Sequence, residues 1–315
     1  MTHAEQLLKL AARATRCWTS KFLLPNMTQS WYRFAAVRWM LACLVLSVVP
    51  VFAQPKLIGA FSSEGAPPWV SFGALSGDAS YDDMVAAAER SRRTGFGWVL
   101  QLGYSALPLQ PAEHGAAFAI YRAKDAGLWP YVIAVTYGEE WYERFYAGEF
   151  APYGFPATRP DGPEQVRAWM SRQQCALKTY SVGDVPIVWI TGAVTAVRAV
   201  PDCTDVVAVE AYVPDGATFA SIEPVLAEAE TATTLPLAII PRWFASKGPF
   251  QGPHWQMTKH APTRDMVEGA VRVLRRPRWI AMWGFLWASR PYAELTGLAD
   301  MPQVRHWLEA ALGVR

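Results

Sequence analysis

Adjacent carboxylates near the middle of the chain could perform general acid–base chemistry. Glu139 and Glu140 follow the mostly apolar residues 131–137 and precede Trp141. A carboxyl group held against aromatic rings is desolvated, and this raises its pKa toward the range that a general acid needs near neutral pH. Neighbouring residues point in different directions, so we expect only one of the two to face a site. Alternatively, both belong to the first turn of the next helix, where the helix dipole favours acidic residues.

Another carboxylate, Glu210, lies within the otherwise apolar residues 206–212. An ionised carboxylate on a buried strand is costly unless it is paired or lies at a ligand site. Glu210 is therefore either a functional residue or one half of a structural salt bridge, for example with Arg242 on the following strand.

The elements that must position these residues alternate along the chain from Lys56 onward. Short apolar runs, most of them rich in β-branched and aromatic residues, are typical of parallel strands buried on both faces. They are Leu57–Phe61, Trp98–Leu102, Tyr131–Tyr137, Ile187–Ile190, Val206–Tyr212, Leu237–Ile240 and Trp279–Trp287. The amphipathic stretches of helical period between and after them are Tyr81–Arg93, His114–Ala126, Glu164–Tyr180, Ser221–Thr231, Arg264–Leu274 and Gln303–Leu312. Strands that alternate with helices predict crossover connections and a parallel sheet.

Seven strands are clear, and an eighth could lie around Trp69–Ala74, where no helix separates it from the first. The alternatives are a TIM-type (β/α)8 barrel with one irregular unit and an open doubly wound sheet. The first strand is followed by residues 61–65, which do not form a Gly-rich phosphate loop. Residues 54–315 also match the roughly 250 residues of a barrel. We therefore predict one α/β barrel domain over 54–315, with its reactive groups at the carboxyl ends of the strands.

Residues 1–53 are expected to be a presequence outside the fold. The apolar run Trp39–Val49 follows a basic segment and precedes the small residue Ala53, which is the layout of a secretory signal peptide. This run is shorter than the about 20 residues of a membrane span. Met27 opens a stretch of ordinary signal-peptide length and is a candidate for the true start. The expected location is secreted or periplasmic, without stable membrane insertion after cleavage; the alternative is an uncleaved signal that anchors the protein.

The charge balance argues against a nucleic-acid partner. The presequence holds six of the 29 basic and one of the 27 acidic residues, so the remaining chain has 23 basic and 26 acidic residues and a net charge of −3. No basic surface is expected in the mature part. With 52% hydrophobic and only 18% charged residues, the composition is that of a globular chain with a large core.

Two cysteines, Cys175 and Cys203, remain in the mature part. An even count in an exported protein allows one disulfide, and two ordinary buried thiols are the alternative. No Cys/His spacing resembles a zinc site, and the five histidines are scattered. The sequence therefore predicts neither a metal nor a cofactor.

Three short motifs resemble those of exported bacterial glycoside hydrolases with (β/α)-barrels. Gly138-Glu139-Glu140-Trp141 is similar to the Gly-Asp-Glu-Pro or Asn-Glu-Pro segment that ends a strand in many of these enzymes. Val209-Glu210-Ala211-Tyr212 is similar to a later strand, and the Trp-rich run Trp279–Trp287 is common where a sugar ring is stacked. The resemblance covers the pattern from Lys56 to the C-terminus, although each motif is only a few residues long.

The resemblance implies hydrolysis of glycosidic bonds by two carboxylates, with a carbohydrate as the substrate. We expect the protein to be a monomer. It places the general acid on Glu140, with Glu139 as the other candidate, and the nucleophile or base on Glu210. Implied substrate contacts are Tyr104, Trp141, Tyr212, Arg242, Trp243, Trp283 and Trp287. Each of these aromatic residues could instead be part of the core, because aromatic rings near strand ends also pack under helices.

One departure from the family pattern bears on the activity. The strand Leu237–Ile240 is followed by Pro241-Arg242-Trp243, without a carboxylate where many retaining barrels carry the nucleophile. A barrel that binds carbohydrate without cleaving it is therefore the competing interpretation. An amidase or esterase is less well supported, because no Gly-x-Ser-x-Gly motif is present.

Overall fold

The computed structural model describes residues 56–102, 115–138, 161–192, 199–246, 260–284, 287–289 and 295–314, together with residues 145, 146, 148, 151, 156 and 158. The predicted presequence, residues 1–53, lies outside the described residues. All elements below belong to one compact unit, Pro55–Arg315.

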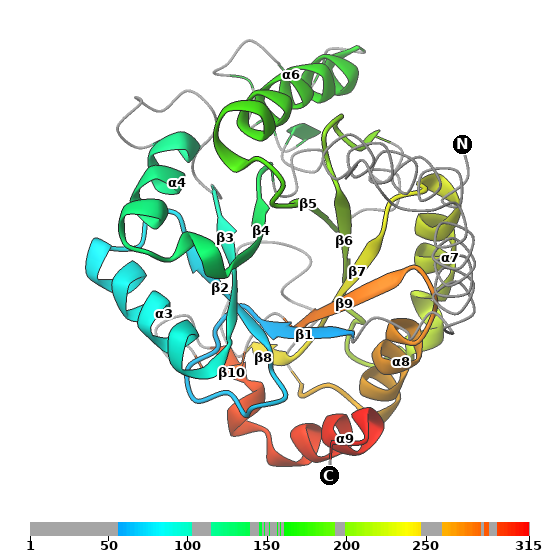
Figure 1. Ribbon diagram of the computed structural model, residues 1–315. Helices are drawn as coiled ribbons and strands as arrows, with labels where there is room; N and C mark the ends of the chain where they lie inside the picture. The colour runs from blue at the N-terminus through cyan, green and yellow to red at the C-terminus, as the bar shows by residue number, and fades with distance from the viewer. Residues whose placement is uncertain are drawn as a thin grey trace, which may run out of the picture. The chain divides into compact units, whose positions relative to one another are not determined.

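Eight parallel strands close into a barrel, as predicted, and the open-sheet alternative is wrong. Each strand pairs with its neighbour in chain order, and the last pairs with the first (Figure 1). The strands are β1 (Leu57–Ala60), β2 (Phe72–Ser76), β3 (Gly97–Gln101), β4 (Val132–Thr136), β5 (Ile187–Thr191), β6 (Val206–Ala211), β7 (Leu237–Pro241) and β9 (Trp279–Gly284).

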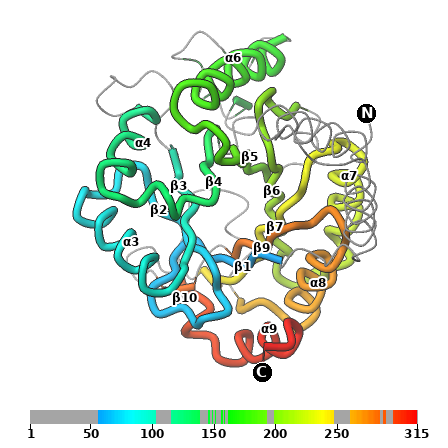
Figure 2. The backbone as a smooth tube through the Cα atoms, in the orientation of Figure 1, coloured from blue at the N-terminus to red at the C-terminus, as the bar shows by residue number. Residues whose placement is uncertain are grey.

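Helices surround the barrel on its outer side, and the tube in Figure 2 shows the strands enclosed by them. They are α3 (Tyr81–Thr94), α4 (Ala116–Asp125), α6 (Gly162–Leu177), α7 (Glu223–Ala232), α8 (Arg264–Leu274) and α9 (Pro302–Leu312). Local sequence explains the starts of α3 and α8. The Ser80 hydroxyl accepts a hydrogen bond from the Asp83 N–H, and the Thr263 hydroxyl accepts one from the Met266 N–H.

The irregular unit lies between β1 and β2, as expected. Residues 61–71 join these two parallel strands without a helix. The end of this connection is fixed by Ser71, whose N–H and hydroxyl both donate to the Ile58 carbonyl, at 2.7 and 3.0 Å. The strand that the sequence left uncertain is β2. It begins at Phe72, within the segment suggested by the sequence, and it is one of the eight strands of the barrel.

A small antiparallel sheet was not predicted. It pairs β8 (Phe244–Ser246) with β10 (Leu295–Gly297). Because β8 follows β7 after two residues, this sheet lies beyond the carboxyl end of the barrel's seventh strand. Strands of three residues carry too little periodicity to be recognised in sequence.

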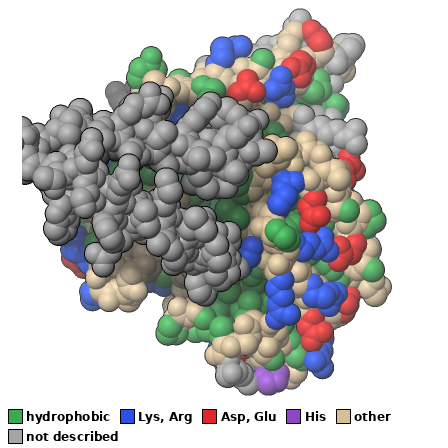
Figure 3. Space-filling view, turned by 45° about the vertical axis from the view of Figure 1, so that its right-hand side comes forward, with side chains coloured by type: hydrophobic (Ala, Val, Ile, Leu, Met, Phe, Trp, Pro, Cys, Tyr) green, Lys and Arg blue, Asp and Glu red, His purple; other side chains and the backbone are tan. Residues whose placement is uncertain are grey.

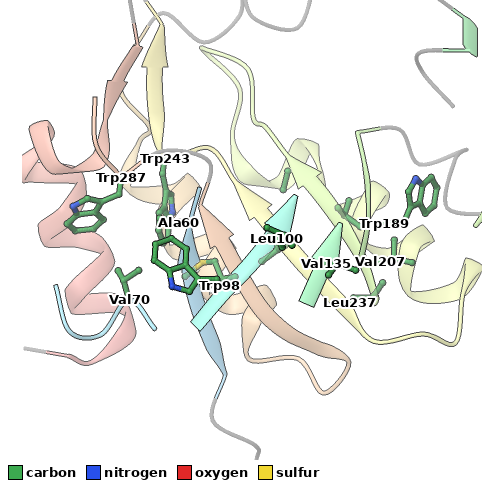
Figure 4. Packing of buried hydrophobic residues seen from close by; sticks show 14 of the residues in the cluster. Ala60, Val70, Trp98, Leu100, Val135, Trp189, Val207, Leu237, Trp243 and Trp287 are labelled. Carbon is green, nitrogen blue, oxygen red and sulfur yellow. The ribbon is translucent and has the colours of Figure 1, made fainter. Parts of the chain in front are cut away.

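The apolar core has two parts, as the fold requires. One lies between the strands and the helices and includes the labelled residues of Figure 4, among them Trp98, Trp189, Trp243 and Trp287. The other fills the barrel interior and includes Phe72, Val99, Val188, Ile190, Ala208, Ala238, Ile240 and Trp283. The barrel is therefore packed with side chains, and only its end can take a ligand.

The amino end of the barrel carries an ionic cluster. Arg276 pairs with Glu223 at 2.5 Å and with Glu230 at 3.2 Å, and the Trp279 indole N–H donates to Glu230 at 2.6 Å. Trp279 is the first residue of β9, so the cluster joins this end of the barrel to α7 and the end of α8.

On the face displayed in Figure 3, basic and acidic side chains are interspersed.

A disulfide joins Cys175 on α6 to Cys203, with their Cα atoms 5.3 Å apart. Of the two alternatives left open by the sequence, the structure thus has the disulfide. Among the described residues, we find no helix whose length and apolar character would let it cross a membrane.

Candidate functional site

Glu210 lies on the inner face of the barrel, one residue before the end of β6. Side chains alternate along a strand, and Ala208 belongs to the barrel interior whereas Val207 and Val209 belong to the outer core. Glu210 therefore shares the inner face with Ala208, and it pairs in register with Ile240 of β7. The carboxylate is half-buried and accepts a hydrogen bond from the Tyr212 hydroxyl at 3.2 Å.

Three further polar residues occupy the inner positions at the ends of neighbouring strands. Ser76 pairs in register with Gln101, which pairs with Thr136. Each follows, by two residues, a side chain that packs in the barrel interior: Ala74, Val99 and Ala134. With Glu210, they form the polar layer that we call the mouth, above an apolar interior. Sequence analysis missed these three residues, because a single polar residue at the end of an apolar strand is a common feature.

Trp283 lies on the inner side of β9 and is buried, with 2% of its surface exposed. Its ring stacks on Phe61, with centroids 4.0 Å apart and an interplanar angle of 3°. Phe61 directly follows β1 and was not among the predicted site residues. The Trp283 indole nitrogen is buried and makes no hydrogen bond within the part of the chain that the structure describes.

Arg242 is buried and is bonded to Asp215. Its Nη2 atom lies 2.7 Å from Asp215 Oδ1, its Nη1 donates to the Val213 carbonyl at 2.8 Å, and its Nε donates to the Phe244 carbonyl at 3.3 Å. The His260 carbonyl also accepts from Nη2, and the His260 N–H donates to Asp215 Oδ2 at 3.0 Å.

The acidic partner that the structure gives Arg242 is Asp215 and not the suggested Glu210. Burial lowers the pKa of the Arg242 guanidinium, and the Asp215 carboxylate opposes that change. The guanidinium therefore anchors the chain beyond β6 and β7 at the carboxyl end of the barrel.

The remaining predicted residues fall into three groups. Trp243 and Trp287 are buried in the outer core, with 1% and 2% of their surfaces exposed, so neither ring presents a face to solvent in this structure. Tyr212 is half-buried and packs edge-on against Phe244. Residues Glu139, Glu140, Tyr104 and Trp141 lie outside the described residues.

The strand that precedes the adjacent carboxylates Glu139 and Glu140 can be placed in the barrel. It is β4, the fourth strand of the barrel, and it is followed by the buried Tyr137 and by Gly138, whose φ is +85°. Counting forward through the clear apolar runs would have made this the third strand, and the irregular β2 accounts for the difference.

Among the described residues, no group of three or more His, Cys, Asp or Glu side chains could hold a metal ion.

Comparison with known proteins supports the fold. No protein-family model and no curated protein matches the sequence. A solved GH53 catalytic domain from Ignisphaera aggregans has a TM-score of 0.51 at 12% identity, covering 80% of this chain and 92% of that one. A glycoside hydrolase family 17 β-1,3-glucanosyltransferase from Rhizomucor miehei has a TM-score of 0.44 at 12% identity, covering 79% and 95%. Endonuclease IV from Thermus thermophilus has a TM-score of 0.45 at 14% identity, covering 81% and 100%.

The class of protein defined by these observations is the TIM-type (β/α)8 barrel. The solved GH53 catalytic domain shares this fold. At 12% identity, the likeness to the GH53 catalytic domain shows the fold and not a specific activity.

Proposed function

We propose that the protein is a glycoside hydrolase that cleaves a polysaccharide or oligosaccharide with two carboxylates. The observation that carries the proposal is the inward-facing, half-buried Glu210 at the mouth of the barrel, where barrel enzymes hold their reactive groups. In this proposal Glu140 protonates the leaving oxygen, with Glu139 as the alternative acid. Glu210 acts as the nucleophile or as the base that activates water.

The environment of Glu210 supports this division of roles. The Tyr212 hydroxyl donates to Glu210 Oε1 at 3.2 Å and so orients the carboxylate that would act as the nucleophile or base. The separation of the two carboxyl groups would decide the stereochemistry: about 5–5.5 Å gives retention, and about 6.5–9.5 Å leaves room for water and gives inversion.

Aromatic residues near the mouth would contact the apolar faces of sugar rings. We propose Tyr104, Trp141 and Tyr212 for this role. Trp283, which is buried and stacked on Phe61, would support them from the barrel interior. Trp243 and Trp287, which are buried, would support these contacts from the outer core.

Carboxamide variants test the proposal directly. Glu140→Gln and Glu210→Gln keep the side-chain shape and remove the acid or base, so each should lower kcat about 10²–10⁴-fold. The measurement is reducing-sugar release from a panel of polysaccharides and aryl glycosides. Glu268→Gln is the matched control, because Glu268 pairs with Arg264 on the outer helix α8. Undiminished activity in the Glu140→Gln, Glu210→Gln double variant would refute the mechanism.

A barrel that binds carbohydrate without turnover is the second candidate, and Arg242 favours it. At the carboxyl end of β7, where many retaining barrels carry a nucleophile, this chain has a guanidinium committed to Asp215. Isothermal titration on the same glycan panel separates the two functions: saccharide binding by the wild-type protein without reducing-sugar release would establish the binding role.

We further propose that the protein is exported and monomeric. The disulfide between Cys175 and Cys203 supports export, because disulfides persist in oxidising compartments. Mass spectrometry of protein from a bacterial periplasm should find a mature chain that begins after Ala53, and size-exclusion chromatography with light scattering should give a monomer mass. An intact N-terminus in the membrane fraction would favour the anchored alternative.

A further inference from the structure

Gln174 is a completely buried polar side chain on α6 whose two ends reach different segments. Its Nε2 donates to the Tyr137 carbonyl at 3.0 Å, and its Oε1 accepts from the Thr204 hydroxyl at 2.9 Å. Burying an amide is costly unless it is hydrogen-bonded. A Met side chain of similar length would fill the same space without that requirement. The amide thus connects the end of β4 to the segment before β6.

The Tyr137 carbonyl belongs to the first residue after β4, where the strand gives way to a turn. Gly138 follows with a φ of +85°, a conformation that favours glycine. The helix packs directly on this turn, since a Cβ at Gly138 would lie 2.2 Å from the Met170 methyl carbon. Hydrogen bonding by Gln174 at Tyr137 and packing by Met170 at Gly138 therefore act on adjacent residues of this turn.

The helix that carries Gln174 is itself held to the segment that carries Thr204. The disulfide between Cys175 and Cys203 joins them next to both residues, and the Asp202 N–H donates to the Ser171 hydroxyl at 2.9 Å. Rotation or sliding of α6 is limited by these links, so the amide of Gln174 is presented to the Tyr137 carbonyl in a fixed position.

We propose that Gln174 is a positioning residue that fixes the carboxyl end of β4, and with it the direction in which the chain enters Glu139 and Glu140. This inference rests on the proposed function, in which one of these carboxylates is the general acid. Glu139 and Glu140 directly follow Gly138 in the chain, so a shift of the backbone at Tyr137 and Gly138 would be passed on to them. A displacement of about 1 Å at a catalytic group can lower the rate about 100-fold.

The test compares two glutamines of the same helix. Gln174→Met removes both hydrogen bonds and keeps the volume, whereas Gln173→Met, at a half-exposed position on α6, is the matched control. Amide hydrogen exchange by mass spectrometry should be about tenfold faster at residues 136–138 in Gln174→Met, as expected for the loss of one hydrogen bond, and unchanged in β3. On a glycan cleaved by the wild-type protein, kcat should fall about 10–100-fold while KM changes less than about threefold.

A second variant guards against misfolding of the first. Thr204→Val removes only the bond to Gln174 Oε1, so it should give the same local change in exchange at smaller size. Exchange at 136–138 equal to that of Gln173→Met in both variants would overturn the proposal, as would an unchanged kcat in a folded Gln174→Met protein. If the wild-type protein cleaves no glycan, the proposed function fails, while the exchange experiment still decides whether Gln174 positions the end of β4.

Discussion

The guanidinium of Arg242 donates hydrogen bonds to acceptors in three segments that meet at the carboxyl end of the barrel: residues 213–215, Phe244 and His260. Replacing it with Met would leave Asp215 and the Val213 carbonyl without this donor. Breaking a buried ion pair from one side costs about 3–5 kcal/mol. We therefore expect Arg242→Met to lower the free energy of unfolding in urea by about that amount.

The control for Arg242 is another arginine whose ion pair is exposed. Arg264 pairs with Glu268 on the surface of α8 at 2.7 Å. Exposed pairs contribute about 0–1 kcal/mol, so Arg264→Met should change the free energy of unfolding by no more than that. Equal losses in the two variants would show that burial does not strengthen the Arg242 contacts.

Tyr137 should make stability depend on alkaline pH. Burial raises the pKa of its phenol, so the unfolded chain loses this proton from about pH 10, while the folded chain keeps it. The unfolded state then binds fewer protons, and the free energy of unfolding falls by about 1.4 kcal/mol per pH unit above that point.

Urea titrations at pH 9 and pH 11 measure this effect. In Tyr137→Phe the loss of stability between the two values should be smaller by about 1.4 kcal/mol than in the wild-type protein. Tyr180→Phe, at a position that is 85% exposed, is the control and should leave the difference unchanged. An identical pH dependence in Tyr137→Phe and wild type would contradict the assignment.

At the same scale, the sequence indicated the polar residues of the mouth only in part. Glu210 could be recognised because a carboxylate within an apolar strand is unusual. The inner polar residues Ser76, Gln101 and Thr136 could not, because single polar residues at strand ends are common. The pairing of Arg242 with Asp215 depends on where the chain turns after β6 and β7. No local sequence pattern predicts the distance between these two side chains.

The strands and helices themselves were largely predictable. Buried parallel strands read as continuous apolar runs, and α8 begins and ends where its period does. A helix between two apolar runs is the usual sign of a crossover connection. The β1–β2 unit was ambiguous because its connection lacks one. The sequence of β2, Phe72–Ser76, contains small and polar residues and so differs little in hydrophobicity from the loops around it. Only its place in the closed barrel identifies it as a strand.

Close contact between β9 and the outer core depends on Gly284. A Cβ at this position would lie 1.7 Å from Trp243 Cε3, within a ring that is itself buried. Overpacking of this kind costs about 1–3 kcal/mol or more, so Gly284→Ala should lower the free energy of unfolding accordingly.

A double-mutant cycle checks that the indole is the cause. In a Trp243→Leu background the added methyl group meets a smaller side chain, and Gly284→Ala should cost at least about 1 kcal/mol less than in the wild-type background. Additive losses would place the strain elsewhere in β9.

For the molecule as a whole, the disulfide restrains the unfolded chain. Cys175 and Cys203 are 28 residues apart, and a loop of this length contributes about 3–4 kcal/mol. The variant with both cysteines replaced by Ser should lose about that much stability in urea. Reductant should lower the stability of the wild-type protein in the same way and leave the variant unchanged; a response of the variant to reductant would contradict this account.

Both ends of the described barrel unit lie on the side away from the mouth. Lys56, just before β1, donates to the Arg276 carbonyl, and Arg275 donates to the Ala311 carbonyl near the end of α9. An affinity tag or a solid support attached at the C-terminus would therefore leave the opposite face open to a bulky polymer. Under the proposed function, immobilised protein should then capture or degrade long-chain glycans as well as free protein does.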